Sequence, residues 1–464
     1  MGRVREVAKA GAFFDLDRTM LRGASGPLIS EALASVGLAP SRQLPGQGAL
    51  YRFYDLVGES LPAMALARGA VLMTRGWPRS VVREAAHQAA DRLVELVAPY
   101  APVILDEHRQ AGRPVVLATT TPFDLIQPFA ERLGFDDVVA TRYAERDGIY
   151  TGRLEGEFVW ARGKLAAIRR WAEGHGVDVA QSWAYSDSFY DLPLLSAVAH
   201  PNAVNADPRL ALVAALRRWP QLHLDAPPGV PKLLGVEPFD VLRVLSRPEL
   251  VPFVRFDIGG TERIPRIGPA IVVANHRSYF DPFAVGMAVM HTGRLPRALG
   301  KKEVFDAPVL GTLARAFGQI RVDRDGNGAD AFAAAIRALR AGELVTLMPQ
   351  GTIPRGAAFY EPKLHGKTGA ARLAAASGAP VIPIGLWGTE QVWPRRARLP
   401  NVTTVAHPPT VRVRVGGPVQ GLTGHDAVAD TERIMDAIVE LLPPEARRPA
   451  EPSEEEIRRA TPSG

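Results

Sequence analysis

Short apolar runs that end at polar residues alternate with long stretches of helical spacing between residues 9 and 225. The runs are Ala12–Phe14, Pro114–Ala118 and Ser182–Tyr185. Continuous apolar character is typical of strands buried in a parallel sheet, and functional side chains gather at the carboxyl ends of such strands. The pattern predicts an α/β domain built on a parallel sheet.

A long insertion interrupts this rhythm after the first apolar run. Residues 25 to about 110 are rich in Ala, Leu and Val at helical spacing. The segment is too long to be a simple crossover between two strands. We therefore expect a helical cap inserted into the first domain.

A second alternation of strand-like and helical segments extends from about residue 253 to 444. Its apolar runs are Ala270–Ala274, Glu343–Met348, Pro380–Ile384 and Thr410–Val415. Between the two regions, the prolines of residues 226–231 can continue neither a helix nor a central strand. We predict α/β domains at residues 1–225 and 253–448, a linker at 226–252, and a mobile tail at 449–464 that is rich in Pro, Ser, Glu and Arg.

The composition fits packed α/β domains and limits their chemistry. A chain of 464 residues with 47% apolar positions is long enough for about two to four domains of ~150 residues. The absence of cysteine excludes disulfides, thiolate nucleophiles and thiolate-bound metals. Any metal must therefore be held by oxygen or imidazole.

The formal charge of +6 suits nucleic acid, an anionic membrane or phosphorylated substrates as partners. Nucleic acid is not expected, because no module motif is present and the arginines are not interleaved with aromatic residues. Amphipathic pieces between Lys232 and Arg255 either pack on a neighbouring domain or lie on a membrane surface. The chain start has no apolar signal run, and no segment is long enough to span a membrane, so we expect a cytoplasmic protein.

Two carboxylates follow the first apolar run. Asp15 and Asp17 occupy alternate positions and can both face a substrate once the chain curls into a loop. Clustered carboxylates repel a phosphate dianion, so the site needs a divalent cation, and hard oxygen ligands favour Mg²⁺. Asp187 and Asp191, after the third run, supply matching acids.

Two further groups suit phosphoryl transfer. Thr119 ends an apolar run and can hydrogen-bond a phosphoryl oxygen, and Lys164 can offset its charge. With Asp15-Leu-Asp17-Arg-Thr19 and Asp187–Asp191, they form an ordered set over residues 9 to 225. The set resembles the haloacid dehalogenase superfamily of phosphatases, in the branch with a helical cap on a Rossmann-like core.

This resemblance implies that Asp15 is the nucleophile that forms an aspartyl-phosphate and that Asp17 is the general acid. Mg²⁺ would be held by Asp15, Asp17 and Asp187, with Asp191 as a direct or outer partner. Phosphoserine phosphatases of this branch carry Glu nine residues after the nucleophile, where this chain has Ala24. That departure argues against phosphoserine as the substrate.

The second candidate site is His276 with Asp281. On one continuous helix, five residues at ~100° each would place the two side chains about 140° apart. They can pair only if His276 lies in a turn and Asp281 on the next helix, and Asp281-Pro282 suits a helix start. A histidine backed by a carboxylate is a general base for a hydroxyl, and a capped turn with a hydrogen-bonded His is the alternative.

Later sequence blocks extend this motif. They are Gly300–Pro308, Gly318–Arg324, Met348–Gly356 and Val381–Gly385. In this order, the blocks over about residues 253 to 420 resemble the glycerolipid acyltransferases that esterify lysophosphatidic acid. The resemblance implies that His276 is the base, that Asp281 orients it, and that acyl-CoA is the donor. Arg324 and the loop of Gln350, Gly351 and Thr352 would bind the glycerol phosphate.

One block departs from the family pattern. The usual Pro-Glu-Gly-Thr-Arg is here Pro349-Gln350-Gly351-Thr352-Ile353. An amide replaces a carboxylate, the usual Arg is absent, and the sequence leaves open whether Arg355 reaches the same phosphate. The departure weakens the substrate assignment more than the fold.

Together these patterns predict a bifunctional enzyme of phospholipid metabolism. An acyl-CoA-dependent acyltransferase that makes phosphatidic acid would be fused to an Mg²⁺-dependent phosphomonoesterase, in peripheral contact with the inner, anionic face of the membrane. The alternatives are an O-acyltransferase for another lipid fused to a phosphatase of soluble metabolites, or a fusion in which one domain is catalytically silent.

Overall fold

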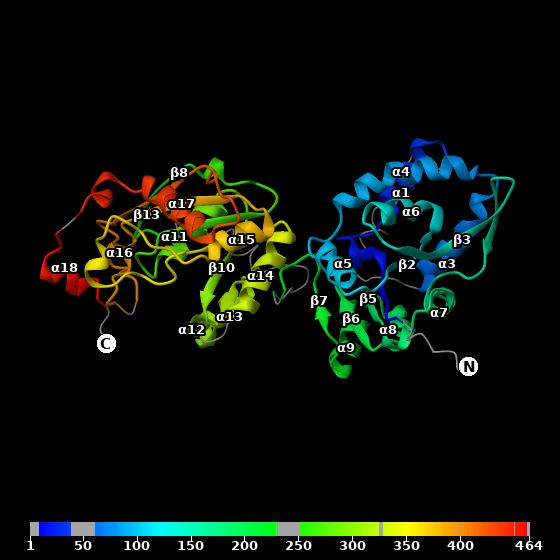
Figure 1. The fold of residues 1–464 in the computed structure, drawn as a ribbon. Helices are drawn as coiled ribbons and strands as arrows, with labels where there is room; N and C mark the ends of the chain where they lie inside the picture. Colours follow the sequence, from blue (N-terminus) through cyan, green and yellow to red (C-terminus); the bar gives the residue numbers. More distant parts are fainter. Residues whose placement is uncertain are drawn as a thin grey trace, which may run out of the picture. The chain divides into compact units, whose positions relative to one another are not determined.

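The computed structural model describes residues 9–38, 61–228, 230, 251–323, 328–397, 399–449 and 451–461. The chain divides into two compact units, Met1–Pro228 and Gly229–Gly464, and Figure 1 shows the elements of each. Each unit is an α/β structure with its own seven-stranded sheet among the described residues. The predicted fold class is therefore confirmed for both halves.

The first sheet has the order β4-β3-β2-β1-β5-β6-β7. All neighbouring strands are parallel except β3 and β4. The strands are β1 (Ala12–Phe14), β2 (Val115–Pro122), β3 (Asp137–Arg146), β4 (Ile149–Glu155), β5 (Trp183–Ser186), β6 (His200–Val204) and β7 (Gln221–Leu222). Because β1 lies between β2 and β5, the three predicted apolar runs end side by side at one edge of the sheet.

Successive residues of β1 face opposite layers of the first unit. Phe13 belongs to a core with α7 (Arg162–His175), α8 (Leu192–Leu195) and α9 (Pro208–Arg217). On the other face, Phe14 stacks on Tyr185 at 4.5 Å and meets His108 of α5 (Ala101–Gln110) edge-on. Helices on both faces account for the uninterrupted apolar character of the strands.

The helices before α5 lie within the range predicted for the cap. α1 (Gly26–Ser35) packs on α4 (Arg79–Glu95), and α4 packs on α6 (Phe123–Arg132), as Figure 1 shows. α3 (Leu61–Ala70) continues into a short 3-10 turn, η2 (Val71–Thr74), which contacts β4. α5, which falls within the range of 25 to about 110 expected for the cap, packs on β2 of the central sheet. Residues 39–60 of the predicted cap lie outside the described part of the chain.

The second sheet has the order β11-β10-β12-β9-β13-β14-β8, and only β13 and β14 are antiparallel. Its strands are β8 (Arg255–Gly259), β9 (Ala270–Ala274), β10 (Pro296–Lys301), β11 (Ile320–Val322), β12 (Leu344–Leu347), β13 (Val381–Trp387) and β14 (Thr410–Val415). The central β9 ends directly before Asn275 and His276. Its neighbours β12 and β13 bring the Met348–Gly356 block and Trp387 to the same edge.

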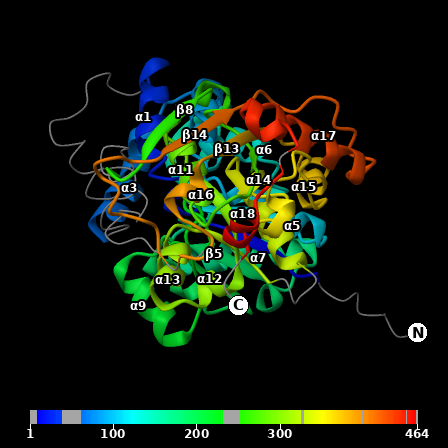
Figure 2. The ribbon, with the colours of Figure 1, turned by 90° about the vertical axis from the view of Figure 1, so that its left-hand side faces the viewer.

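Helices cover both faces of the second sheet. Val272 shares a core with α11 (Asp281–Met290) on one face. Ile271 and Val273 share another with α14 (Ala329–Arg340), α15 (Gly369–Ser377) and α17 (Ala427–Glu440). Figures 1 and 2 show α15 and α17 side by side. Shorter helices are α12 (Lys302–Asp306), α13 (Pro308–Ala316) and α16 (Thr389–Val392).

The segment predicted to be a mobile tail contains a helix, α18 (Glu454–Arg459). A capping box at Ser453 and Glu456 begins it, and α18 contacts the 3-10 turn η7 (Gly356–Phe359). Composition did not predict this helix, because its packing partner is distant in sequence. Most of the predicted amphipathic linker, residues 231–250, lies outside the described residues. No helix within the described ranges is both long and apolar enough to cross a membrane.

Candidate active sites

Asp15 lies at the carboxyl end of the central strand of the first sheet. Its N–H donates to the carbonyl of Tyr185 at 2.9 Å, so β5 fixes the backbone of the loop that follows β1. Lys164, in the first turn of α7, places Nζ 2.8 Å from Asp15 Oδ1 and 2.6 Å from Asp191 Oδ2. The lysine side chain is only 1% exposed. A buried ammonium therefore ties together two of the predicted carboxylates.

Asp17 and Asp187 have different partners. Asp17 Oδ1 accepts a hydrogen bond from the Ser25 N–H at 2.6 Å, at the start of the cap. Asp187 faces the guanidinium of Arg18 at 3.4 Å. Arg18 has a left-handed backbone with φ of 58° and is held by reciprocal hydrogen bonds with Asn205. The Asp17 carboxylate thus contacts the cap entrance, while Arg18 offsets the charge of Asp187.

The four predicted magnesium ligands are not assembled into a ready metal cluster. Within the described ranges, no three Asp, Glu or His side chains are grouped closely enough to hold a metal ion. One oxygen does suit a cation, since Asp191 Oδ1 is buried without a hydrogen-bond partner while Oδ2 accepts from Lys164 and Ser186. All four acids offer carboxylate oxygens, which are the type of ligand that Mg²⁺ prefers.

Thr119 and Ser186 also lie at this edge of the sheet. Thr119 is buried near the end of β2, and its hydroxyl accepts from the Thr121 N–H at 3.2 Å, which leaves the O–H proton for another acceptor. Ser186 is fully buried and donates to Asp191 at 2.7 Å. Sequence reasoning missed Ser186, although its place at the end of an apolar run, one residue before Asp187, was a usable signal.

His276 and Asp281 meet across the turn between β9 and α11. His276 Nδ1 lies 2.7 Å from Asp281 Oδ2, and α11 begins at Asp281. The same carboxylate oxygen accepts from the N–H groups of Arg277 at 2.5 Å and Ser278 at 2.7 Å. Asp281 is fully buried, whereas the His276 side chain is 16% exposed. The carboxylate is fixed by the turn, and one edge of the imidazole reaches the surface.

Two amide side chains fix the backbone at this turn. Gln350 Oε1 accepts from the His276 N–H at 2.6 Å, so the residue that replaces the usual Glu keeps an acceptor there. Asn275 exchanges two hydrogen bonds with the backbone of Leu386 in β13. Sequence reasoning placed Gln350 in the predicted phosphate-binding loop and noted it as a departure, but it did not predict this contact with the His276 backbone. It gave Asn275 no role.

Arg277 ties the histidine turn to three other segments. Its guanidinium donates to both carboxylate oxygens of Glu390, at 3.2 and 3.0 Å. It also lies over the rings of Phe359, at 4.3 Å, and Trp387, at 4.2 Å. These partners lie in η7, α16 and at the end of β13, and no sequence spacing relates them. We call Arg277, Glu390, Phe359 and Trp387 the arginine clamp.

The predicted glycerol phosphate residues are only partly described. Arg324 lies outside the described residues. Gly351 has φ of 71°, in the left-handed region that favours glycine, and Thr352 is exposed. Ile353, which occupies the position of the usual Arg, is 2% exposed and belongs to the interior.

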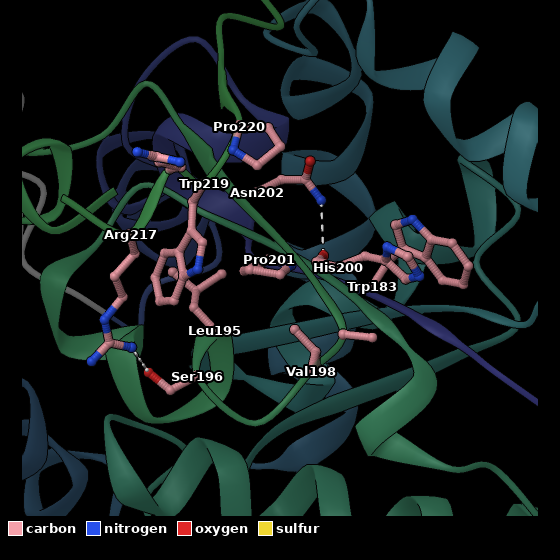
Figure 3. Close-up of a pocket in the computed structure, with 12 residues that line it drawn as sticks. Trp183, Leu195, Ser196, Val198, His200, Pro201, Asn202, Arg217, Trp219 and Pro220 are labelled. Carbon is pink, nitrogen blue, oxygen red and sulfur yellow. Dashed lines mark hydrogen bonds between the residues drawn. The ribbon is translucent and has the colours of Figure 1, made fainter. Parts of the chain in front are cut away.

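A cavity of about 740 Å³ in the first unit lies away from these residues. Figure 3 shows Trp183, His200 and Trp219 among the side chains that line it. Trp183 is the first residue of β5, whereas Asp187 follows its last residue. The cavity is therefore at the opposite end of the strand from Asp15 and is not the predicted site.

The first unit combines acids at the carboxyl ends of parallel strands with a buried lysine from α7, an arrangement typical of α/β hydrolytic enzymes. Residues 12–196 match the family described as haloacid dehalogenase-like hydrolase. The inhibition of morphological differentiation protein of Streptomyces azureus is 34% identical over 225 residues, which cover 47% of this chain and 80% of that protein. Phosphoserine phosphatase SerB1 of Mycobacterium tuberculosis is 34% identical over 215 residues, 45% of this chain and 69% of that protein. The chain therefore belongs, through its first half, to the haloacid dehalogenase-like hydrolase family.

The second unit carries a different enzyme domain. Residues 255–387 match the acyltransferase family. Among solved structures, the 1-acyl-sn-glycerophosphate acyltransferase PlsC of Thermotoga maritima is 20% identical and covers 43% of this chain and 78% of its own, with a TM-score of 0.33. The predicted fusion of a hydrolase and an acyltransferase in one chain is confirmed. Such domains act on small-molecule and lipid substrates.

Proposed function

We propose that the second unit transfers an acyl group from acyl-CoA to the free hydroxyl of lysophosphatidic acid and so makes phosphatidic acid. The observation that carries this proposal is the 2.7 Å contact between His276 Nδ1 and the buried Asp281. A carboxylate that accepts the Nδ1 proton leaves Nε2 as the basic nitrogen. Nε2 removes the proton of the acceptor hydroxyl as that oxygen attacks the thioester carbonyl. The C–S bond then breaks, and the imidazolium gives that proton to the departing CoA thiolate.

The first unit is proposed to hydrolyse phosphomonoesters. Asp15 is the nucleophile, and the phosphoryl group moves from the substrate oxygen to its carboxylate. Asp17 protonates the leaving oxygen and then takes a proton from the water that cleaves the aspartyl-phosphate. Lys164 offsets the negative charge of the phosphoryl group, and Thr119 donates a hydrogen bond to one of its oxygens. The buried contact of Lys164 with Asp15 supports this assignment.

Mg²⁺ fits the donor set of this unit. Asp15, Asp187 and Asp191 supply carboxylate oxygens, and the unpartnered Oδ1 of Asp191 is a buried acceptor that a cation would satisfy. A bound Mg²⁺ supplies positive charge that draws the phosphate dianion toward the carboxylates. Two cations offset part of the negative charge of the carboxylates. Arg18 contacts Asp187, and Lys164 contacts Asp15 and Asp191.

The substrates of both units have a second candidate each. Gln350 and Ile353 favour a lipid acceptor other than lysophosphatidic acid, because the charged pair of the usual block is absent. A soluble metabolite is the alternative for the phosphatase. The name of the Mycobacterium tuberculosis relative makes phosphoserine the first compound to test, and Ala24 in place of the usual Glu argues against it.

The deciding experiment measures both activities on the whole chain. His276→Ala is expected to abolish acyl transfer over a panel of lysolipids, and Asp15→Asn to abolish phosphate release over a panel of phosphomonoesters with Mg²⁺. Matched controls are His291→Ala and Asp147→Asn, both at exposed positions outside the two sites. Full acyl transfer by His276→Ala, or full phosphate release by Asp15→Asn, would refute the corresponding assignment.

Peripheral contact with an anionic membrane follows from the lipid substrates of the second unit and from the net charge of +6. Co-sedimentation with anionic vesicles at low salt tests this contact. Binding that is lost at high salt or with neutral vesicles supports it, and a chain that stays in the supernatant at low salt contradicts it.

A further inference from the structure

The second unit needs a cation to hold a phosphate, and the usual one is missing. Ile353 takes the place of the Arg in the Pro-Gln-Gly-Thr-Ile block, and its side chain is 2% exposed. An apolar, buried side chain contributes no charge to a substrate. The question is which other side chain brings positive charge to the turn of Pro349–Thr352.

Lys367 crosses this turn. A Cβ placed on Gly351 would lie 3.3 Å from Lys367 Cδ, 3.4 Å from Cε and 3.6 Å from Nζ. The backbone is joined there too, because the Lys367 N–H donates to the carbonyl of Pro349 at 2.8 Å. The long side chain therefore lies along the bare backbone of Gly351, with its ammonium beside the turn. A larger residue at Gly351 would push it away.

The same turn is joined to the predicted base. Gln350, the residue before Gly351, accepts the His276 N–H at 2.6 Å. Two consecutive residues therefore make the two contacts: Gln350 bonds the His276 backbone, and Gly351 lies against the side chain of Lys367. A phosphate held by this ammonium would be held next to the segment that positions His276.

The ammonium is available to an anion. Lys367 is exposed, and its Nζ has neither an ion pair nor a hydrogen bond with the described residues. α15 begins two residues later, at Gly369, and its N-terminal amides add positive potential nearby.

We propose that Lys367 binds the phosphate monoester of the acyl acceptor and replaces the missing Arg of the block. The proposal rests on the acyltransferase function proposed above and names the chemistry of its acceptor, a lysolipid with a phosphate headgroup. Lys367 is a substrate-binding residue and takes no part in proton transfer. Because a lysine is a flexible point charge and a guanidinium is a rigid planar fork, we also expect the second unit to accept phosphate headgroups of more varied shape.

Steady-state kinetics on the whole chain test the proposal. Lys367→Met should raise the KM for lysophosphatidic acid about tenfold or more, with kcat and the KM for acyl-CoA little changed, because a charge-assisted contact to the acceptor is lost. Lys367→Arg should restore most of the affinity. Lys363→Met, an exposed lysine four residues earlier, is the matched control and should behave like the wild type.

Three kinetic results would overturn the assignment. The KM for lysophosphatidic acid stays unchanged in Lys367→Met, the change falls on acyl-CoA, or transfer to the phosphate-free monoacylglycerol falls equally. The last result would mark Lys367 as a structural residue, and the second would assign its anion to the phosphates of CoA.

A chemical probe separates failure of this inference from failure of the acyltransferase proposal. Pyridoxal 5′-phosphate with borohydride should label Lys367 faster than Lys363, and glycerol 3-phosphate should protect Lys367, as peptide mass spectrometry can measure. If His276→Ala retains full acyl transfer while Lys367 is labelled and protected, the role of His276 fails and the phosphate site stands. If labelling is equal at both lysines and unprotected, the phosphate site fails.

Discussion

Asp281 Oδ2 illustrates how much one atom can fix in this protein. It accepts from the Nδ1 of His276 and from two backbone N–H groups of the same turn. A fully buried carboxylate is costly unless hydrogen-bond donors satisfy it. Here the turn and the proposed base satisfy Oδ2, whereas Oδ1 is buried without a hydrogen-bond partner among the described residues. Asp281 therefore both orients the imidazole of His276 and begins α11.

Gln350 shows that the amide at this position retains a function. Gln350→Leu removes the acceptor of the His276 N–H, and an unpartnered donor in a partly buried turn costs ~1–3 kcal/mol. We expect reduced acyl transfer and a lower melting temperature of the second unit. Gln350→Glu keeps an acceptor and should retain activity. Equal activity of Gln350→Leu and the wild type in the lysolipid assay would show that this hydrogen bond is dispensable.

His108 predicts a pH dependence of stability in the first unit. Burial lowers its pKa from 6.5 to about 4, with smaller contributions from the charges of Arg113 and His200. The folded state disfavours the imidazolium form of His108. The free energy of unfolding of the first unit is therefore not reduced by this residue above pH 6.5, where the side chain is neutral in both the folded and the unfolded state. It decreases as the pH falls from 6.5 toward 4, by up to about 3 kcal/mol.

Urea titrations between pH 4 and 7 measure this dependence. His108→Gln keeps hydrogen-bonding groups for Tyr185 and Arg113 but does not titrate, so its free energy of unfolding should fall less steeply with acid. An identical pH slope in the variant and the wild type would exclude His108 as the cause.

At the scale of elements, the active edges are built by strands that end side by side. β1 lies between β2 and β5, and β9 lies between β12 and β13. In each sheet the central strand delivers the proposed reacting residue and its neighbours deliver the supporting ones. Local sequence cannot encode this adjacency, because the strands are joined through helices that leave the sheet.

The arginine clamp joins the turn after β9 to η7, α16 and the end of β13. Arg277→Lys keeps the charge but loses the bidentate contact with Glu390 and most of the stacking on Trp387 and Phe359. Each stacked ring contributes ~0.5–1 kcal/mol and the charged pair a comparable amount. We expect the second unit to melt at a lower temperature and acyl transfer to fall.

Arg266→Lys, at an exposed position, is the control for this prediction and should melt like the wild type. A melting temperature for Arg277→Lys that matches this control would show that the clamp adds no stability.

At the scale of the whole molecule, two compact units with separate cores predict two unfolding transitions. Ile168 is fully buried in the first core and Ile382 in the second. Truncating either to Ala removes ~2–5 kcal/mol from its own unit. Differential scanning calorimetry should therefore show each variant shifting a different transition. If both variants shift one common transition, the units unfold as a single cooperative structure.

The sequence alone determined the elements with strong local signals. The runs Ala12–Phe14, Ala270–Ala274 and Thr410–Val415 are strands in the structure, because buried strands need continuous or alternating apolar residues. Short or polar strands such as β4, β7 and β11 gave no such signal. The capped helix α18 was missed because its charged residues resemble those of a solvated tail.

The sequence also determined which side chains could do chemistry, since residue types and order fix the available acids, bases and cations. The tertiary structure decided their partners. Lys164 bridges Asp15 and Asp191, Gln350 holds the His276 backbone, and Lys367 lies across Gly351. These contacts join residues up to 149 positions apart. Such distances are set by strand order and helix packing, which depend on the whole core and on no single segment.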